Sequence, residues 1–154
     1  MRFITNLLIV LPARIASYFL WAGPLIMRLI VGYVFMLAGW EKLNALPQVT
    51  ENFAEWGIPF PHILTPFVSS VECFGGALLI VGLFTRIPAA MLAVVMVVAI
   101  KSAKWGDVDS LETLLGFEEA TYLGAFLWLA IAGPGAVSLD RLLARAAGKT
   151  EAVP

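Results

Sequence analysis

The sequence is poor in the side chains that build disulfides, metal sites and nucleic-acid sites. It holds a single cysteine, Cys73, and a single histidine, His62. It therefore has no internal disulfide and cannot by itself assemble a zinc site from cysteine and histidine or a bis-histidine haem site. The formal net charge is −1, and the basic residues are scattered rather than gathered in the patch that nucleic-acid binding requires. We predict no intrinsic cofactor or metal and no nucleic-acid partner.

Charge of either sign is also scarce. Charged residues make up 14% of the chain, against about 25% in a typical soluble domain. Hydrophobic residues make up 60% and the mean hydropathy is +0.89, above the roughly 45–50% apolar content of soluble domains. A soluble fold of this size would lack polar residues to cover its surface, whereas lipid removes that requirement. The composition predicts an integral membrane protein whose first partner is the lipid bilayer.

Apolar stretches recur along the chain at the length that a membrane span needs. A helix requires about 20 mainly apolar residues to cross a hydrocarbon core of roughly 30 Å. The stretches that approach this length cover residues 22–42, 66–84, 87–105 and 118–132. We predict an all-α fold, a four-transmembrane-helix bundle over residues 22–143. The short turn at Thr85-Arg86 predicts that the second and third helices are antiparallel neighbours.

The first 21 residues precede these spans and need a separate interpretation. Met1-Arg2 and the apolar residues after it resemble the start of a secretory signal, but Pro12-Ala13-Arg14 follows in place of a small-residue cleavage site. We predict an N-terminal interfacial amphipathic helix over about Phe3 to Leu20, interrupted at Pro12 and Arg14. Two alternatives remain open: residues 1–21 are cleaved as a signal, or they cross the membrane themselves.

The segments between the spans differ in chemistry. Residues 44–65 contain the aromatic and proline-rich stretch Trp56 to Pro61, which is typical of a membrane interface. Residues 106–117 are acidic, and we expect one short helix there, around Ser110 to Leu115. Residues 144–154 are predicted to be a flexible cytoplasmic tail.

Lysine and arginine placement predicts the orientation, because cytoplasmic segments carry an excess of both. If the N-terminus is cytoplasmic, six basic residues lie on the cytoplasmic side and three lie on the outer side. The cytoplasmic six are Arg2, Arg14, Arg86, Arg141, Arg145 and Lys149, and the outer three are Lys42, Lys101 and Lys104. We expect a multi-pass protein of the inner (cytoplasmic) membrane with both termini in the cytoplasm.

Ionisable residues inside the predicted spans are the strongest functional signal. A charge in the hydrocarbon region costs about 2.5–3.5 kcal/mol on insertion scales, so it usually faces a partner or a wet cavity. Arg28 and Glu72 lie within spans and differ in depth by roughly 9 Å at 1.5 Å per residue, a gap that long side chains nearly close. Lys42, Lys101 and Glu119 also reach the outer third of the predicted bundle.

We therefore predict one charged site in the outer third. Glu72 and Glu119 are the candidate catalytic carboxylates. Arg28, Lys42, Glu72 and Lys101 are the candidate binding residues for a cofactor. The structural alternatives are an ion pair between Arg28 and Glu72 that holds two helices together, and side chains near the interface that extend to water.

Several motifs occur in an order that resembles the DoxX family. They are Arg28-Leu29, Ala38-Gly39-Trp40-Glu41-Lys42, Gly57-Ile58-Pro59, Val71-Glu72 with Gly75-Gly76, Gly82-Leu83-Phe84-Thr85-Arg86, and Gly133-Pro134-Gly135 with Ser138-Leu139-Asp140. The resemblance covers about Arg28 to Leu142. It implies a small four-helix bacterial or archaeal membrane protein. Members of the family include subunits associated with thiosulfate:quinone oxidoreduction and proteins linked to membrane-bound thiol and oxidative-stress systems.

Three functions remain open at this point. The first is a membrane subunit of an oxidoreductase system that binds a quinone at the charged site, with electrons coming from a partner protein. The second is a non-catalytic membrane anchor or assembly factor whose acidic outer loops hold a periplasmic partner. The third is transport of a small anion or proton, for which a homo-oligomer would improve the geometry.

Overall fold

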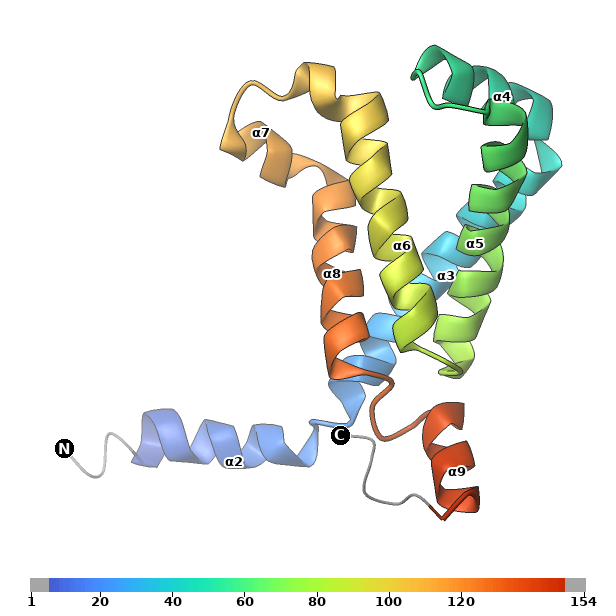
Figure 1. The fold of residues 1–154 in the computed structure, drawn as a ribbon. Helices are drawn as coiled ribbons and strands as arrows, with labels where there is room; N and C mark the ends of the chain where they lie inside the picture. The colour runs from blue at the N-terminus through green and yellow to red at the C-terminus, as the bar shows by residue number, and fades with distance from the viewer. Residues whose placement is uncertain (1–5, 149–154) are drawn as a thin grey trace.

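The computed structural model describes residues 6–148, which are helices joined by turns and loops, with no strand in that range (Figure 1). The elements, in order, are η1 (Asn6–Val10), α2 (Leu11–Tyr18), α3 (Ala22–Asn44), α4 (Leu46–Glu55), α5 (Pro61–Val81), α6 (Arg86–Ala99), η2 (Ile100–Lys104), η3 (Trp105–Asp107), α7 (Leu111–Gly116), α8 (Glu118–Ala132) and α9 (Leu139–Ala146). The predicted all-α class is confirmed.

Three helices are long and apolar enough to cross a membrane. They are α3, α5, and α6 continued through η2 and η3 to Asp107. The fourth predicted span corresponds to α8, whose 15 residues extend about 22 Å, less than the roughly 30 Å of a hydrocarbon core. The structure thus supports three predicted spans by length, and α8 packs beside α6 as a shorter apolar helix.

The two ends of the bundle are formed by different elements. Figure 1 shows α4, η3 and α7 at one end, which we call the α4 end, and α9 below the turns at the other, which we call the α9 end. Helices α5 and α6 are joined at the α9 end by a turn between Val81 and Arg86, and they diverge toward the α4 end. The predicted antiparallel pair is confirmed.

Close backbone contact fixes α3 against α5. A Cβ atom at Gly39 would lie 2.2 Å from the backbone nitrogen of Cys73, and one at Gly76 would lie 2.4 Å from that of Met36. Neither position therefore has space for a side chain larger than hydrogen. Small residues let two membrane helices approach closely enough for extensive van der Waals contact, so these glycines set the separation of α3 and α5.

A single apolar core joins α3, α5, α6 and α8. Phe35 of α3 packs edge-to-face on Tyr122 and Phe126 of α8, with ring centroids 5.1 and 4.8 Å apart, a favoured aromatic geometry. Leu79 and Leu92 contribute to the same core and are fully buried. The fourth predicted helix is therefore an integral part of the bundle.

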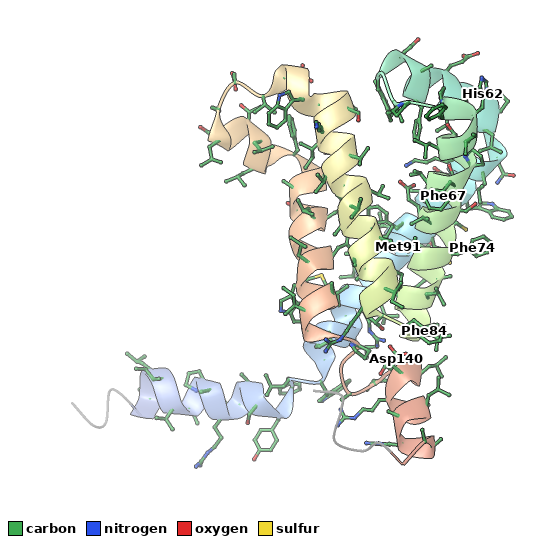
Figure 2. The ribbon with its side chains drawn as sticks, in the orientation of Figure 1. His62, Phe67, Phe74, Phe84, Met91 and Asp140 are labelled. Carbon is green, nitrogen blue, oxygen red and sulfur yellow. The ribbon has the colours of Figure 1, made fainter. Side chains whose placement is uncertain are left out.

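Apolar side chains also cover the outside of the helices. Phe74 points away from α5 (Figure 2) and is 65% exposed, and Ile131 of α8 is 76% exposed. Water-soluble monomers rarely expose apolar patches of such extent. The faces that these residues occupy are suited to lipid, in agreement with the membrane-length helices.

The segments outside the bundle differ in part from expectation. The N-terminal segment is helical, but it runs through Pro12 and Arg14 without a break, and its hydrogen-bond pattern changes from the π type of η1 to the α type of α2 just before the proline. The second span begins at Pro61, five residues before the predicted Pro66. The predicted short acidic helix is confirmed as α7, with Ser110 as its N-cap.

The segment before α5 holds a helix that we did not expect. Leu46, Val49 and Phe53 recur at helical spacing in α4, and Phe53 is buried. The tail prediction for residues 144–154 falls partly outside the described residues, as does the part of the N-terminal prediction before Asn6. Within the described range, residues 144–146 are the last turn of α9.

Candidate functional site

The most buried acid in the described structure is paired with a lysine near the α4 end. The Nζ atom of Lys42 lies 2.8 Å from Glu72 Oε1 and 2.6 Å from Oε2. The Glu72 side chain is 2% exposed, whereas that of Lys42 is 36% exposed. A buried carboxylate is tolerated when a cation and hydrogen bonds compensate for its desolvation, and Lys42 supplies both.

The helix contact described above positions this pair. Lys42 lies in the last turn of α3, three residues after Gly39, and Glu72 precedes Cys73, whose backbone Gly39 touches. The lysine therefore reaches across the α3–α5 contact to the carboxylate. Because a wider separation of the two helices would pull the charges apart, the glycine contact and the ion pair depend on the same geometry.

Two hydroxyl groups share the face of α5 that carries Glu72. Thr65 and Ser69 are seven and three residues before it and are fully buried, and their side-chain oxygens have no hydrogen-bond partner among residues 6–148. Spacings of three, four and seven residues place side chains on one helix face. A polar stripe thus runs along α5 from Glu72 toward the α4 end.

An apolar cavity of about 390 Å³ adjoins the Lys42–Glu72 pair. It lies between α5 and α6, with α4 and the residues after it at one end. Its lining includes Phe67 of α5, Met91 of α6 and Trp56 of the connecting segment, and Figure 2 labels the first two. A mainly apolar space with a few convergent polar groups is the usual form of a small-molecule site.

Glu119 and Lys101, which were predicted to join the same site, lie away from the cavity beside Glu72. Glu119 pairs with Lys104 at 3.8 Å, and their side chains are 16% and 40% exposed. Lys104 also lies 5.5 Å from the centroid of the Phe117 ring. Lys101 is exposed and lines a separate groove with Trp105 and residues of α7 and α8. Neither Glu119 nor Lys101 lines the cavity beside Glu72.

Arg28 lies at the opposite end from this cavity. It is 1% exposed, its Nη2 atom donates to the Val137 carbonyl, and its Nη1 atom packs against Gly82. Gly82 is ten residues beyond Glu72, which is about 15 Å along α5. The predicted contact between Arg28 and Glu72 is therefore wrong, because α3 and α5 are antiparallel in a register that brings Lys42 to the carboxylate.

The expected single cluster is thus divided among three places. Lys42 and Glu72 come together, Lys101 and Glu119 lie on the α6–α8 side, and Arg28 lies at the α9 end. Depth estimates from helix boundaries did not separate Lys101 and Glu119 from Glu72, because they give height in the membrane and not the direction around each helix. They also understated the distance along the bundle between Arg28 and Glu72. The roles of these residues, catalytic or binding, stay predictions.

Sequence reasoning also missed the cavity itself. We treated Trp56 as an interface residue, but Trp56 and Ile58 line the cavity together with Phe53. The helical spacing of Leu46, Val49 and Phe53 is the signal that would have revealed α4. Among residues 6–148, no group of three or more His, Cys, Asp and Glu side chains is arranged to hold a metal ion.

Comparison with known proteins shows the family. A family model for DoxX matches residues 23–105, which include all but the first residue of α3 and the whole of α4, α5, α6 and η2. The chain belongs to the DoxX family. The matched region contains Lys42 and Glu72 and all of the residues that line the cavity beside them.

Curated relatives of this DoxX protein are also membrane proteins. It is 31% identical over 121 residues to "Inner membrane protein YqjF" of Escherichia coli (strain K12), covering 79% of this chain and 92% of the relative. It is 32% identical over 123 residues to "Inner membrane protein YphA" of the same organism, covering 76% and 87%.

A more distant relative carries an enzyme name. "Putative oxidoreductase CatD" of Bacillus subtilis (strain 168) is 29% identical over 82 residues, covering 53% of this chain and 60% of the relative. No solved structure matches the chain. Together with the membrane-length helices, these similarities show a membrane protein of the DoxX family.

Proposed function

We propose that this DoxX protein is a membrane subunit of an oxidoreductase system and that a quinone binds in the cavity beside Lys42 and Glu72. The observation that carries the proposal is the placement of a buried ion pair at the wall of an apolar cavity of about 390 Å³. That volume lies within the roughly 300–1,000 Å³ of small-molecule sites. The distant relative named as an oxidoreductase supports the same class of function.

The cavity residues match the chemistry of a quinone. Aromatic and apolar side chains such as Phe67 and Met91 suit the ring and the isoprenoid tail. Reduction of a quinone to a quinol takes up two electrons and two protons, and the electrons come from a partner protein. Lys42 donates a hydrogen bond to a ring oxygen and stabilises the charge that develops there, while Glu72 transfers protons to the ring oxygens.

Two buried hydroxyls support a route for proton supply to Glu72. The hydroxyls of Thr65 and Ser69 lie along the same face of α5 toward the α4 end. In the proposed reaction, the Glu72 carboxylate takes up a proton from that end before each of the two proton transfers to the quinone. A hydroxyl both donates and accepts hydrogen bonds, so these two side chains are suited to line such a path.

Titration with a short-chain quinone tests the binding step. The wild-type chain, purified in neutral detergent, should bind the quinone saturably, with quenching of Trp56 as part of the fluorescence signal. Val94→Trp should abolish binding, because Val94 lines the cavity. Val97→Trp is the matched control, since Val97 is an exposed valine of the same helix that lines the groove on the α6–α8 side.

Glu72→Gln tests the chemical step. The substitution keeps the side-chain shape but removes the proton-transferring carboxylate, and general acid–base groups typically contribute about 10²–10⁴-fold to rate. Quinone reduction by membranes that contain the intact system should therefore fall by about 100-fold or more, whereas Glu119→Gln should leave the rate nearly unchanged. Absent quinone binding, together with an unchanged rate in Glu72→Gln, would refute the proposal.

A second function is supported by the exposed α7 segment. Leu111 and Leu115 are 69% and 64% exposed there, and Asp107, Asp109 and Glu112 are exposed around them. Such a surface suits an anchor or assembly factor that holds a partner protein. Loss of a co-purifying partner in a variant with all three acids changed to Asn or Gln, with normal binding in Glu72→Gln, would favour this second function.

We also propose that α8 makes a fourth crossing and that the α9 end faces the cytoplasm. The support is that α8 packs along α6 within the common core, and that Arg14, Arg86, Arg141 and Arg145 lie at the α9 end or in segments next to it. Thiol labelling from outside the cell tests both points in a Cys73→Ala background. A cysteine replacing Glu112 should react, and one replacing Arg145 should not.

A further inference from the structure

The α9 end contains a pocket that the proposed quinone chemistry does not use. Its volume is about 390 Å³, and it lies between α9 and the ends of α3 and α5. Three arginines line it: Arg28 from α3, and Arg141 and Arg145 from α9. Arg141 and Arg145 are four residues apart and therefore project from the same face of the helix.

Arg28 brings unused hydrogen-bond donors to this pocket. It is 1% exposed, and its Nε and Nη1 atoms have no partner among residues 6–148. A guanidinium has five N–H donors in a planar fork that matches the oxygens of a phosphate. A buried cation with unpaired donors is costly, and an anion at the pocket would lower that cost.

The acid nearest to these arginines is engaged elsewhere. Asp140 accepts from the backbone N–H of Phe84 at 2.7 Å and from that of Thr85 at 3.0 Å, and Figure 2 shows it beside Phe84 at the turn between α5 and α6. Its charge attracts Arg28, but both carboxylate oxygens are occupied by the backbone. One carboxylate against three arginines leaves the pocket cationic.

The remaining lining identifies the class of anion. Leu25, Ile80, Val81 and Leu142 also line the pocket, so an apolar wall adjoins the arginines. Helix α9 exposes Leu139, Leu142 and Leu143, as helices that lie in the membrane interface do. A free phosphate makes no favourable contact with an apolar wall. A phospholipid, in contrast, can place its phosphate on the arginines and the start of its acyl chains on the apolar residues beside them.

We infer that this pocket binds the headgroup phosphate of an anionic glycerophospholipid. Arg141 and Arg145 contact the phosphate, Arg28 supplies positive charge from beneath, and the acyl chains run along Leu25, Ile80 and Val81. Basic pockets between membrane helices are known to hold anionic lipid headgroups. The bound lipid would tie α9 to the ends of α3 and α5.

Thermal unfolding of the full chain in neutral detergent tests the inference, because a ligand that binds the folded state raises the unfolding temperature. Phosphatidylglycerol should raise that temperature saturably, and phosphatidylcholine should not. The double variant Arg141→Gln/Arg145→Gln should weaken the apparent affinity by roughly 25-fold, from about 1 kcal/mol for each arginine near a lipid surface. These residues are intermediate to exposed, so the variant should fold.

The matched control removes the same charge outside the pocket. Arg14→Gln/Arg86→Gln should keep the wild-type affinity for phosphatidylglycerol. The inference would be overturned by equal effects of the two lipids, by an equal loss of affinity in the control, or by inorganic phosphate protecting as well as phosphatidylglycerol at equal concentration. Quinone binding should be unchanged in both double variants, so failure here is distinguishable from failure of the quinone proposal.

Discussion

The two ion pairs near the α4 end show that similar residues can serve different purposes. Lys42 and Glu72 are 2.6 Å apart, and the carboxylate is almost completely buried, whereas Lys104 and Glu119 are 3.8 Å apart and both are partly exposed. Only the first pair lies beside the cavity between α5 and α6. Exposed pairs contribute little to stability, and a buried carboxylate strongly requires its cation.

The difference follows from how closely the helices approach. Gly39 and Gly76 bring the backbones of α3 and α5 into contact, and the carboxylate of Glu72 beside this contact is almost fully shielded from water. On the α6–α8 side, a Cβ atom at Gly124 of α8 would meet nothing within 4 Å. Lys101 and Lys104 lie there in the π-helix η2, whose turns are wider than those of an α-helix. Whether a charged side chain is buried therefore depends on where glycines let the helices approach, and not only on where the charged residue lies in its helix.

The largest effect is expected from Lys42→Met. It leaves the Glu72 carboxylate buried without its cation, which typically costs about 3–5 kcal/mol of unfolding free energy. Chemical denaturation in detergent, followed by circular dichroism, measures the loss. The double variant Lys42→Met/Glu72→Leu should recover most of it, because replacement of both charges by apolar groups is often neutral. A double variant as unstable as the single one would show that the pair itself stabilises the fold.

A smaller loss is expected from Gly39→Ala. The added methyl group would lie 2.2 Å from the backbone nitrogen of Cys73, so α3 and α5 must separate, at a cost of about 1–3 kcal/mol for overpacking. Gly124→Ala is the control and should stabilise α8 by up to about 1 kcal/mol through helix propensity. The same unfolding assay compares the two. Equal effects of the substitutions would contradict the close contact.

Lys104→Met should change the unfolding free energy by less than about 1 kcal/mol, as exposed ion pairs usually do. The Glu119 side chain is 16% exposed and therefore less desolvated than that of Glu72, although its Oε2 atom is buried without a hydrogen-bond partner among residues 6–148. Measured beside Lys42→Met under the same conditions, this variant tests whether burial separates the two pairs. A loss as large as that of Lys42→Met would remove the distinction.

The smallest effect concerns Asp109 in the connection before α7. The Thr113 hydroxyl donates to the Asp109 carboxylate and lowers the pKa of that carboxyl below its ordinary value. Because the pKa is lower in the folded state, the interaction stabilises the turn above the unfolded pKa and is lost as pH falls through the folded pKa. In an NMR titration, Thr113→Val should raise the midpoint of Asp109, and Thr121→Val should not.

The sequence predicted which segments form helices better than it predicted which face of each helix contacts its neighbours. Runs of apolar residues located α3, α5, α6 and α8, and the resemblance to DoxX agreed with them. The start of α5 was misplaced because Pro66 was taken as a first-turn proline, although Pro61 has that position and Pro66 lies inside the helix. The run of apolar residues in one sequence predicts the approximate length of a membrane helix. The residue at which the helix begins depends on the geometry of the turn before it.

The candidate site was predicted in part. Glu72 and Lys42 were both selected as charges that need a partner, but they were not paired with each other. The register of α3 against α5 decides that pairing, and it depends on the contacts of Gly39 and Gly76. Gly75-Gly76 was visible in the sequence as one of the motifs that resemble DoxX, yet a glycine pair in one helix does not say which turn of another helix it meets.

Photolabelling with an azido-quinone tests the central claim most directly. The wild-type chain in native-like bilayers should be labelled within the cavity, on residues such as Phe67, Met91 or Trp56, and excess unlabelled quinone should compete. Val94→Trp should remove the label, and Val97→Trp should retain it. Labelling confined to the groove beside Lys101 and Leu127, or labelling that excess quinone does not reduce, would contradict the account.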